Sequence, residues 1–473
     1  MPTEPINFGP QQASGDSPLA GAAPLCMNVV VDGMGAVRRR PGLSAYSQVA
    51  TMPGEVRAIG YFGADNAALF VSYDEDQENS RIYALKYGVG FSEVSDSSTS
   101  TRLLGTARPI IADSKNDAFI IAGKAPQRIR MGLTSERLAG SPPVGNSIAS
   151  IASRVLIDDR NSKSTRGQIR WCDPGVTGIE TWDELEFAEA EARPDELVRI
   201  AENTNELWAF GQTTTQIFNP DPVSVFAPGR ALNVGCAATH SPIRVDDSFA
   251  WLDNQKRFII SDGRGYQELS GGIADTLDGI TTVSDCYGFR VNIGQFDCLC
   301  WTFPTDGRTF VYQQGGGWAQ WSGYTNGRYQ PFALRSHHYV DTQDVHLVGL
   351  ESGRVAEFDT AATTDLGDTI KGEVTTGFIN RGTDATKECN VVRLVLKRGQ
   401  ATTAPVLRVS WRDDLGAFCR PVTVSLGTRG DYVHTVELRS LGTYRARQWK
   451  LEMSDAADIV VARVEEDFSM GAN

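Results

Sequence analysis

Long apolar runs are missing from this 473-residue sequence, and no stretch approaches the ~18 apolar residues that a membrane-spanning helix needs. The first ten residues, MPTEPINFGP, also lack the basic region and the apolar core of a secretory signal. We therefore expect no targeting segment and no direct membrane insertion.

Cysteine is sparse and has no recognisable pattern. None of the eight cysteines stands in a Cys-x-x-Cys motif, and in a cytosolic chain of this size such usage predicts free, mostly buried thiols. The positions are Cys26, Cys172, Cys236, Cys286, Cys298, Cys300, Cys389 and Cys419.

Catalytic motifs are missing as well. The sequence contains no GxSxG elbow, no GxxxxGK[ST] loop, no HExxH and no Rossmann glycine fingerprint. His337-His338 and His346 could lie close across a predicted hairpin and are the one candidate metal site, but they lack matching Cys or carboxylate spacing. We therefore expect no catalytic residue, no metal, no cofactor and no enzymatic activity.

Positive charge is scarce, because 45 Lys and Arg stand against 58 Asp and Glu, for a formal net charge of −13. A protein that holds nucleic acid by its phosphates needs clustered Lys and Arg instead. The deficit lies in residues 1–370, with 30 basic and 45 acidic residues, whereas residues 371–473 hold 15 and 13. Trp182–Glu191 alternates acidic with apolar or small residues. It is either a half-exposed strand with an acidic face or a surface that repels DNA.

Strand-forming residues are plentiful, and few windows keep a 3.6-residue apolar period, so we predict a mostly β protein. Glu206–Pro220 shows the pattern most clearly. An apolar run at Leu207–Phe210, a glycine-containing turn and a return strand at Thr214–Phe218 predict a β-hairpin. Both faces of the first strand are apolar, which indicates that it is covered on both sides.

Seven such hairpins follow one another, and their first strands begin roughly 36 to 53 residues apart, near the ~40–50-residue period of propeller blades. A blade packs between two neighbours, which explains strands that are apolar on both faces. We therefore predict an all-β fold with a β-propeller of six or seven blades; a stacked pair of β-sandwiches is the alternative. The first strands are predicted at Ala68–Tyr73, Ala118–Gly123, Arg154–Ile157, Leu207–Phe210, Phe249–Leu252, Cys298–Phe303 and Val345–Leu350.

Composition changes at both ends of the repeat region. Residues 1–25 are rich in Pro, Gly, Ala, Ser and Gln and predict an extended N-terminal arm. We assign the propeller to residues 26–365, with the strand near Met27–Val31 completing the last blade. Residues 366–473 carry alternating strands such as Val406–Trp411 and predict a small C-terminal β-sandwich.

Two basic clusters are candidate interface residues. The first ends a predicted strand and is either a solvated strand end paired with carboxylates or a contact for an acidic partner or a phosphate. The second surrounds a turn and is either a solvated basic loop or an interface. The clusters are Arg38, Arg39 and Arg40, and Arg439, Arg445, Arg447 and Lys450.

Three segments together resemble a phage family: Arg39-Arg40-Pro41-Gly42-Leu43, the hairpin of Trp208-Ala209-Phe210-Gly211 with Gln216-Ile217-Phe218, and Arg447-Gln448-Trp449-Lys450-Leu451. In the order of its elements and in length, most of the chain is similar to the packaged-DNA-stabilisation proteins of short-tailed bacteriophages. These are also described as tail hub, nozzle or tail accessory proteins.

The resemblance implies a structural protein of the virion tail, assembled in the host cytoplasm. It implies a propeller-bearing subunit of a homohexameric ring below the portal and its adaptor protein. The ring would extend the DNA channel, help retain packaged DNA before ejection, and support fibres or spikes and a tail needle. An acidic molecule suits double-stranded DNA that passes without tight binding, because each phosphate contact with Lys or Arg would add affinity and friction.

Two other classes of function stay open at this stage. The first is a carbohydrate-binding or glycosidase-type propeller that acts on the host surface. Ser261-Asp262-Gly263 and Thr305-Asp306-Gly307 match the Asp-box turns of sialidases only superficially. The second is a host-side propeller scaffold that binds proteins outside any virion.

Overall fold

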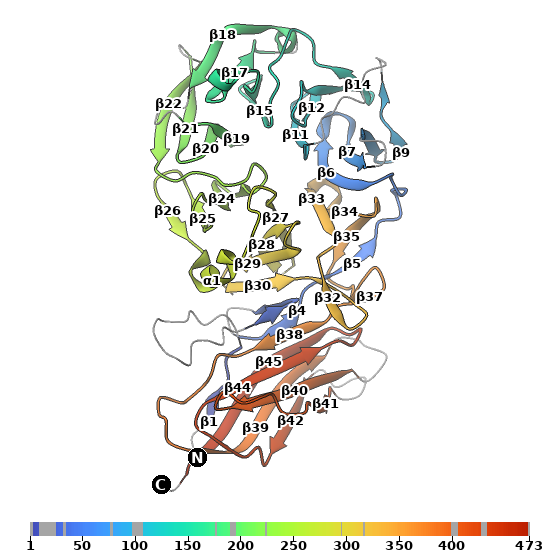
Figure 1. Ribbon diagram of the computed structural model, residues 1–473. Coiled ribbons are helices and arrows are strands. Elements are labelled where there is room, and N and C mark those ends of the chain that lie inside the picture. Colours follow the sequence, from blue (N-terminus) through green and yellow to red (C-terminus); the bar gives the residue numbers. More distant parts are fainter. Residues whose placement is uncertain are drawn as a thin grey trace.

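The computed structural model describes residues 3–8, 25–31, 35–75, 79–96, 107–175, 177–189, 195–222, 225–294, 296–315, 317–398, 405–426 and 433–471. Within these ranges strands dominate, and the one α-helix is α1 (Ala274–Asp278). The chain forms a ring of sheets joined along one side to a β-sandwich (Figure 1). Most of the predicted N-terminal arm lies outside the described residues.

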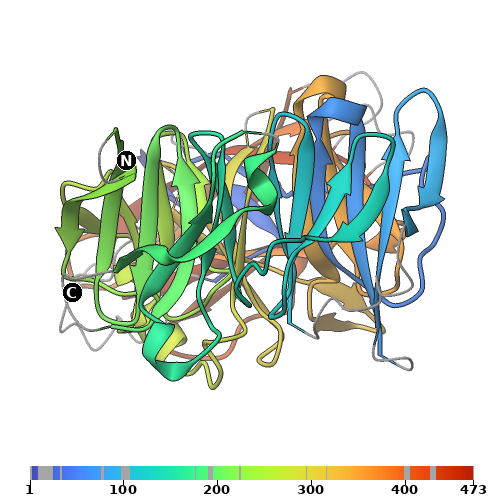
Figure 2. The same ribbon diagram turned by 90° about the horizontal axis from the view of Figure 1, so that it is seen from above.

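Seven sheets follow one another around the ring in the described part of the chain, and each contributes four antiparallel strands to a blade. In the view from above, the blue strands of blade one and the green strands of blade four lie on opposite sides (Figure 2). The first strand of blade seven, β33, packs against the first strand of blade one, β6, and closes the circle. The prediction of an all-β propeller with six or seven blades is confirmed, with seven.

The first four blades contain these strands, in order from the centre outward. Blade one has β6 (Glu55–Phe62), β7 (Ala67–Asp74), β8 (Asn79–Lys86) and β9 (Gly90–Glu93); blade two has β11 (Ile110–Asp113), β12 (Asp117–Ile121), β13 (Gln127–Arg130) and β14 (Thr134–Arg137), with β10 (Ser95–Asp96) on its edge; blade three has β15 (Ile148–Ile151), β16 (Arg154–Asp158), β17 (Gln168–Cys172) and β18 (Trp182–Glu189); blade four has β19 (Leu197–Asn203), β20 (Glu206–Gly211), β21 (Thr215–Asp221) and β22 (Val225–Leu232).

The remaining three blades follow the same order. Blade five has β23 (Ile243–Val245), β24 (Ser248–Leu252), β25 (Phe258–Ser261) and β26 (Tyr266–Glu268); blade six has β27 (Tyr287–Ile293), β28 (Phe296–Phe303), β29 (Arg308–Gln313) and β30 (Gly317–Trp321); blade seven has β33 (Leu334–Val340), β34 (Val345–Leu350), β35 (Val355–Asp359) and β5 (Gly42–Ala45). A small hairpin, β31 (Gly323–Thr325) and β32 (Arg328–Gln330), follows blade six. The short pair β36 (Thr364–Asp365) and β37 (Asp368–Thr369) extends blade seven beyond β5.

The middle two strands of every blade are the seven predicted hairpins, and they are buried on both faces. In blade four, Trp208 and Phe210 pack toward Phe249 and Trp251 of blade five. The alternate residues, including Leu207, pack toward blade three. The double-sided apolar pattern therefore has the physical cause that the sequence indicated, namely a neighbouring blade on each side.

The ring is closed by a strand from the N-terminal part of the chain, but not by the predicted one. β5 pairs with β35, whereas the predicted closing segment splits into β2 (Cys26–Met27) and β3 (Val29–Val31). Between them Asn28 has a φ of 53°, in the left-handed region, which prevents one continuous strand. β2 instead pairs with β30 of blade six.

The C-terminal β-sandwich has two sheets that enclose an apolar core. One sheet contains β3, β4 (Val37–Arg39), β45 (Ile459–Met470), β39 (Lys387–Arg398) and β42 (Val433–Arg439), with β1 (Thr3–Pro5) on β45 and β43 (Thr443–Tyr444) on β39. The other contains β2, β38 (Gly372–Thr375), β44 (Arg447–Met453), β40 (Val406–Asp413) and β41 (Val422–Ser425).

Two predicted domain boundaries differ from this arrangement. Residues Thr3–Pro5, assigned to the arm, pair with β45, and Ile6 and Phe8 lie in the sandwich core. β3 and β4, assigned to the propeller, belong to a sandwich sheet. The apolar N-terminal residues find their partners more than 400 positions away, so local composition could not reveal the pairing.

All eight cysteines are free, and seven of them are buried; Cys419 is half-buried. This usage agrees with the predicted free thiols. In the part of the chain that the structure describes, no helix is long and apolar enough to cross a membrane.

Ring closure yields a first testable prediction. A Cβ at Gly42 would lie too close to Thr364 O and 2.7 Å from Ala362 O, both backbone atoms. We expect Gly42→Ala to destabilise the protein by about 1–3 kcal/mol, because β5 must shift away from its neighbours. Gly377→Ala is the control, since nothing lies within 4 Å of its Cβ position. Equal thermal midpoints for the two variants would contradict the closure described here.

Candidate functional site

Arg40, from the first predicted interface cluster, is an internal residue with 2% exposure. Its guanidinium forms an ion pair with Asp365 and donates hydrogen bonds to Asn28 Oδ1 and Ser322 O. It also lies 4.7 Å above the Phe332 ring. The side chain thus links the N-terminal segment to the segments that follow blades six and seven.

The two neighbouring arginines divide between surface and interior. Arg38 forms a partly exposed ion pair with Asp458 at 3.0 Å. Arg39 is buried and donates hydrogen bonds to Ile370 O and Ala457 O. Burial therefore corrects the interface interpretation for Arg39 and Arg40, because their donors are directed to partners within the chain.

The second cluster divides in the same way. Arg447 is fully buried, with Asp413 Oδ1 at 2.6 Å from Nε and the Tyr444 ring 4.4 Å from its guanidinium carbon. This also corrects the interface interpretation for Arg447. The other three reach solvent, so their role in an interface remains a prediction; they are Arg439, Arg445 and Lys450.

The histidines that formed the candidate metal pair bind each other instead. His346 Nε2 lies 2.8 Å from Asn292 O and must donate, because a carbonyl only accepts. Its Nδ1 then accepts a hydrogen bond from His337 Nε2 at 3.0 Å. Burial lowers the pKa of both rings, which keeps them neutral. No group of three metal-ligating side chains occurs among the described residues.

His338 provides a pH-dependent prediction. Burial lowers its pKa from 6.5 to about 4. Between these values the unfolded chain binds a proton that the folded chain does not, so stability falls as the pH drops through this window. We expect His338→Asn to lose stability less steeply between pH 6.5 and 4 than the parent. A ring titration near pH 6.5, measured by NMR, would contradict this.

The centre of the ring is a channel lined by the first strands of the blades. A cavity of about 260 Å³ lies among residues of β6, β11, β19, β27 and β33, together with Arg108 and His240. A second cavity of about 700 Å³ shares Arg199, Phe289 and His337 with it and continues along the same strands. The channel thus contains two adjoining cavities that share part of their lining.

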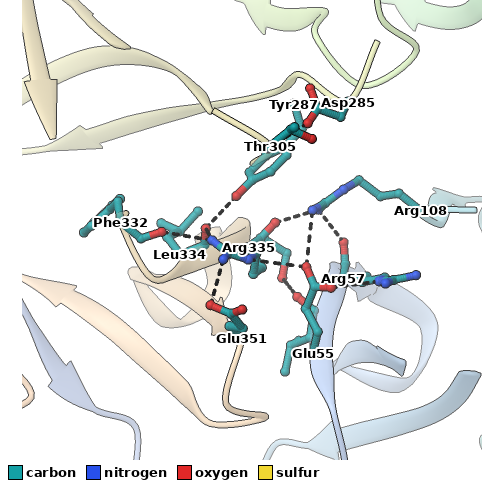
Figure 3. A network of polar contacts seen from close by, with 12 residues as sticks. Glu55, Arg57, Arg108, Asp285, Tyr287, Thr305, Phe332, Leu334, Arg335 and Glu351 are labelled. Atoms are coloured by element: carbon teal, nitrogen blue, oxygen red, sulfur yellow. Dashed lines mark hydrogen bonds and ion pairs between the residues drawn. The ribbon is translucent and has the colours of Figure 1, made fainter. Parts of the chain in front are cut away.

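Arginines gather where these first strands begin (Figure 3). The Glu55 carboxylate lies 2.9 Å from Arg57 Nε and 3.6 Å from nitrogen atoms of both Arg108 and Arg335. Arg335 also reaches Glu351 at 2.7 Å. Three arginines thus share the half-buried Glu55 carboxylate, and Glu75 lies 4.0 Å from Arg57 as a further partner.

Arg108 spans the channel between blades. Its Nη1 donates to Arg57 O at 2.9 Å and to Arg335 O at 2.6 Å, and its guanidinium carbon lies 3.9 Å from the centre of the Tyr287 ring. The Tyr287 hydroxyl in turn donates to Leu334 O at 2.6 Å. These contacts hold blades one, six and seven at fixed positions around the cavity.

The far end of the first strands has the opposite character. Burial raises the pKa of Asp113 to about 6 and raises that of Glu202, whose carboxylate accepts a hydrogen bond from Ser150 N at 3.0 Å. Arg290 is paired there with both Asp246 and Asp297 at 2.9 Å. The channel therefore runs from an arginine-rich end to an end where carboxylates gather.

The channel arginines were not among the functional residues predicted from the sequence. They are far apart in the chain and each stands alone, so no local cluster marks them. These arginines could have been found by comparing the repeats, because each lies in or just before the first strand of a different blade. The set is Arg57, Arg108, Arg199 and Arg335.

Residues 176–363 match a sequence family described as "Bacteriophage P22 Gp10, beta-propeller". The matched stretch runs from the end of blade three through β35 of blade seven. This part of the chain is similar to the propeller of that phage family, which supports a phage structural protein. Comparison with curated proteins finds no match.

Solved structures share low sequence identity with this chain. Raptor from Chaetomium thermophilum has 8% identity and a TM-score of 0.40, covering 67% of this chain and 28% of its own. An auxiliary nutrient binding protein from Bacteroides thetaiotaomicron has 10% identity and a TM-score of 0.37, covering 71% and 75%. An exo-beta-1,3-galactanase from Phanerochaete chrysosporium has 10% identity and a TM-score of 0.27, covering 91% and 100%. This chain thus spans well under two thirds of Raptor.

Proposed function

We propose that this protein is a structural component of a short phage tail, a hub or nozzle subunit that assembles into a ring below the portal and its adaptor. The observation that carries the proposal is the family match over residues 176–363, which span the last strand of blade three, all of blades four to six and three of the four strands of blade seven. In this role the protein extends the DNA channel, helps retain packaged DNA and supports fibres or spikes.

The propeller and the sandwich are joined by a continuous β-sheet, which suits a rigid subunit of a ring. β2 pairs with β30 of blade six on one side and with β38 of the sandwich on the other. One sheet of nine strands therefore runs from the propeller into the sandwich. Backbone hydrogen bonds across the join favour a fixed angle between the domains, as a ring subunit under internal pressure requires.

DNA in such an assembly would pass between subunits rather than through a propeller. The cavities within the ring of blades are about 260 and 700 Å³, and a duplex whose major groove alone is roughly 12 Å wide cannot enter them. The acidic strand β18 lies on the outer edge of blade three, with Asp183 and Glu184 exposed. Such a surface repels phosphates and suits the wall of a conduit.

Reconstitution tests this role. The purified protein is mixed with the portal–adaptor complex of its phage and imaged by negative stain, and the portal without its adaptor serves as control. We expect a ring, with six copies as the favoured number, added below the adaptor and absent from the control. A protein that stays monomeric and never joins the complex would overturn the proposal.

A further inference from the structure

Arg199, at the arginine-rich end of the channel, forms fewer polar contacts than the other arginines there. It lines both cavities from β19 of blade four. Within the described residues its Nη1 donates one hydrogen bond, to Thr239 O at 3.2 Å, and its Nε is buried without a partner. No described carboxylate forms an ion pair with it, so this half-buried guanidinium has a buried donor without a partner.

Arg199 lies among other charged groups in the lining of the smaller cavity. Burial lowers the pKa of Arg199 to about 10 and lowers that of Arg108. Burial lowers the pKa of His240 in the lining of the smaller cavity, and the charges of Arg108 and Arg199 lower it further. Glu55 is shared by three other guanidinium groups. Arg335 also pairs with Glu351, Arg57 lies 4.0 Å from Glu75, and Asp113 lines the same cavity. Arg199 is the cavity arginine that has no ion pair among the described residues.

We propose that the smaller cavity binds a phosphate group, held by Arg199 and Arg108 with His240 and Arg335 around it. Guanidinium groups suit phosphate because they offer several donors in a fixed plane, and a dianion can pair with more than one of them. These residues lie on or beside the first strands of blades two, four, five and seven. A bound phosphate would thus link blades across the channel.

The volume of the cavity limits the size of the ligand. At about 260 Å³ it lies just below the roughly 300–1,000 Å³ typical of small-molecule sites. Inorganic phosphate and the head of a small phosphomonoester have the same recognising chemistry and fit this limit. Double-stranded DNA does not, so the site is separate from any DNA conduit.

Calorimetric titration of the full-length protein with sodium phosphate tests the site, with sodium chloride at equal ionic strength as the blank. A second titration uses glucose 6-phosphate. Binding of both compounds would indicate a site for phosphomonoesters, whereas binding of sodium phosphate alone would assign the site to the free ion. We expect saturable binding and a thermal midpoint that rises with phosphate concentration. Absence of saturable binding in both titrations would overturn the proposal.

Two variants locate the site. Arg199→Gln removes one charged donor, whose loss of about 1.5–3 kcal/mol corresponds to roughly 10- to 150-fold weaker binding. Arg439→Gln changes an exposed arginine of the sandwich and should bind like the parent. Unchanged affinity in Arg199→Gln would contradict the assignment. If that variant fails to fold, crystals of the parent protein are soaked in selenate and examined by anomalous diffraction. An anomalous peak beside Arg199 would support the site, and the absence of a peak would overturn it.

Discussion

Replacement of Trp208 by Asp is expected to abolish the folded propeller. Trp208 is fully buried and meets Phe210 of its own strand and Phe249 and Trp251 of the next blade at ring-centre distances of 5.2 to 6.3 Å. Truncation of a buried Trp costs about 3–5 kcal/mol, and an unpaired buried carboxylate adds several more. This sum reaches the roughly 5–15 kcal/mol that stabilises a typical domain.

Far-UV circular dichroism and sedimentation of the purified variant measure this effect. Leu185→Asp is the matched control, because Leu185 is 84% exposed on the edge strand β18 and should change stability by no more than about 0.5 kcal/mol. A folded, soluble Trp208→Asp protein with the thermal midpoint of the control would show that this strand is not enclosed between two blades.

Replacement of Arg40 by Ala is expected to cost about 3–5 kcal/mol of unfolding free energy. The change leaves the carboxylate of Asp365, with 15% side-chain exposure, without its cation. It also removes donors from Asn28 Oδ1 and Ser322 O, which lie in the buried seam between the domains. Stability should be lost because these groups cannot return to water while the chain stays folded.

Denaturant unfolding of Arg40→Ala beside Arg38→Ala provides the comparison. The Arg38 ion pair with Asp458 is partly exposed on both sides, at 24% and 38%, and should contribute about 0–1 kcal/mol. The two residues are two positions apart in one basic run, so the difference reports burial rather than charge. Equal losses in the two variants would contradict the internal role of Arg40.

The propeller could be predicted from the sequence, because each blade requires a hydrophobic pattern that is visible within a short segment. Strands such as Leu207–Phe210 are apolar on both faces, and a glycine-containing turn separates them from their partners. The closing strand β5 was not predicted. Met27–Val31 was expected to close the ring, because the left-handed Asn28 that divides β2 from β3 leaves no clear signal in composition.

The candidate sites were predicted less completely, for a physical reason. Two partners of Arg40 lie about 300 residues away in the sequence. A run of three arginines has the same local pattern whether its side chains are exposed to solvent or buried between domains. The channel arginines come together only after the ring closes. Arg108 and Arg335 are joined by a hydrogen bond across 227 positions of the sequence. Such proximity depends on topology, which local patterns do not specify.

Cryo-electron microscopy of the purified virion tests whether the protein is a subunit of the tail ring. We expect a ring of density below the portal and adaptor into which the seven-bladed propeller and its fused sandwich fit as one rigid unit, with DNA passing between subunits and not through the blades. A tail map with no density that fits this unit would contradict the assignment of the protein to the tail.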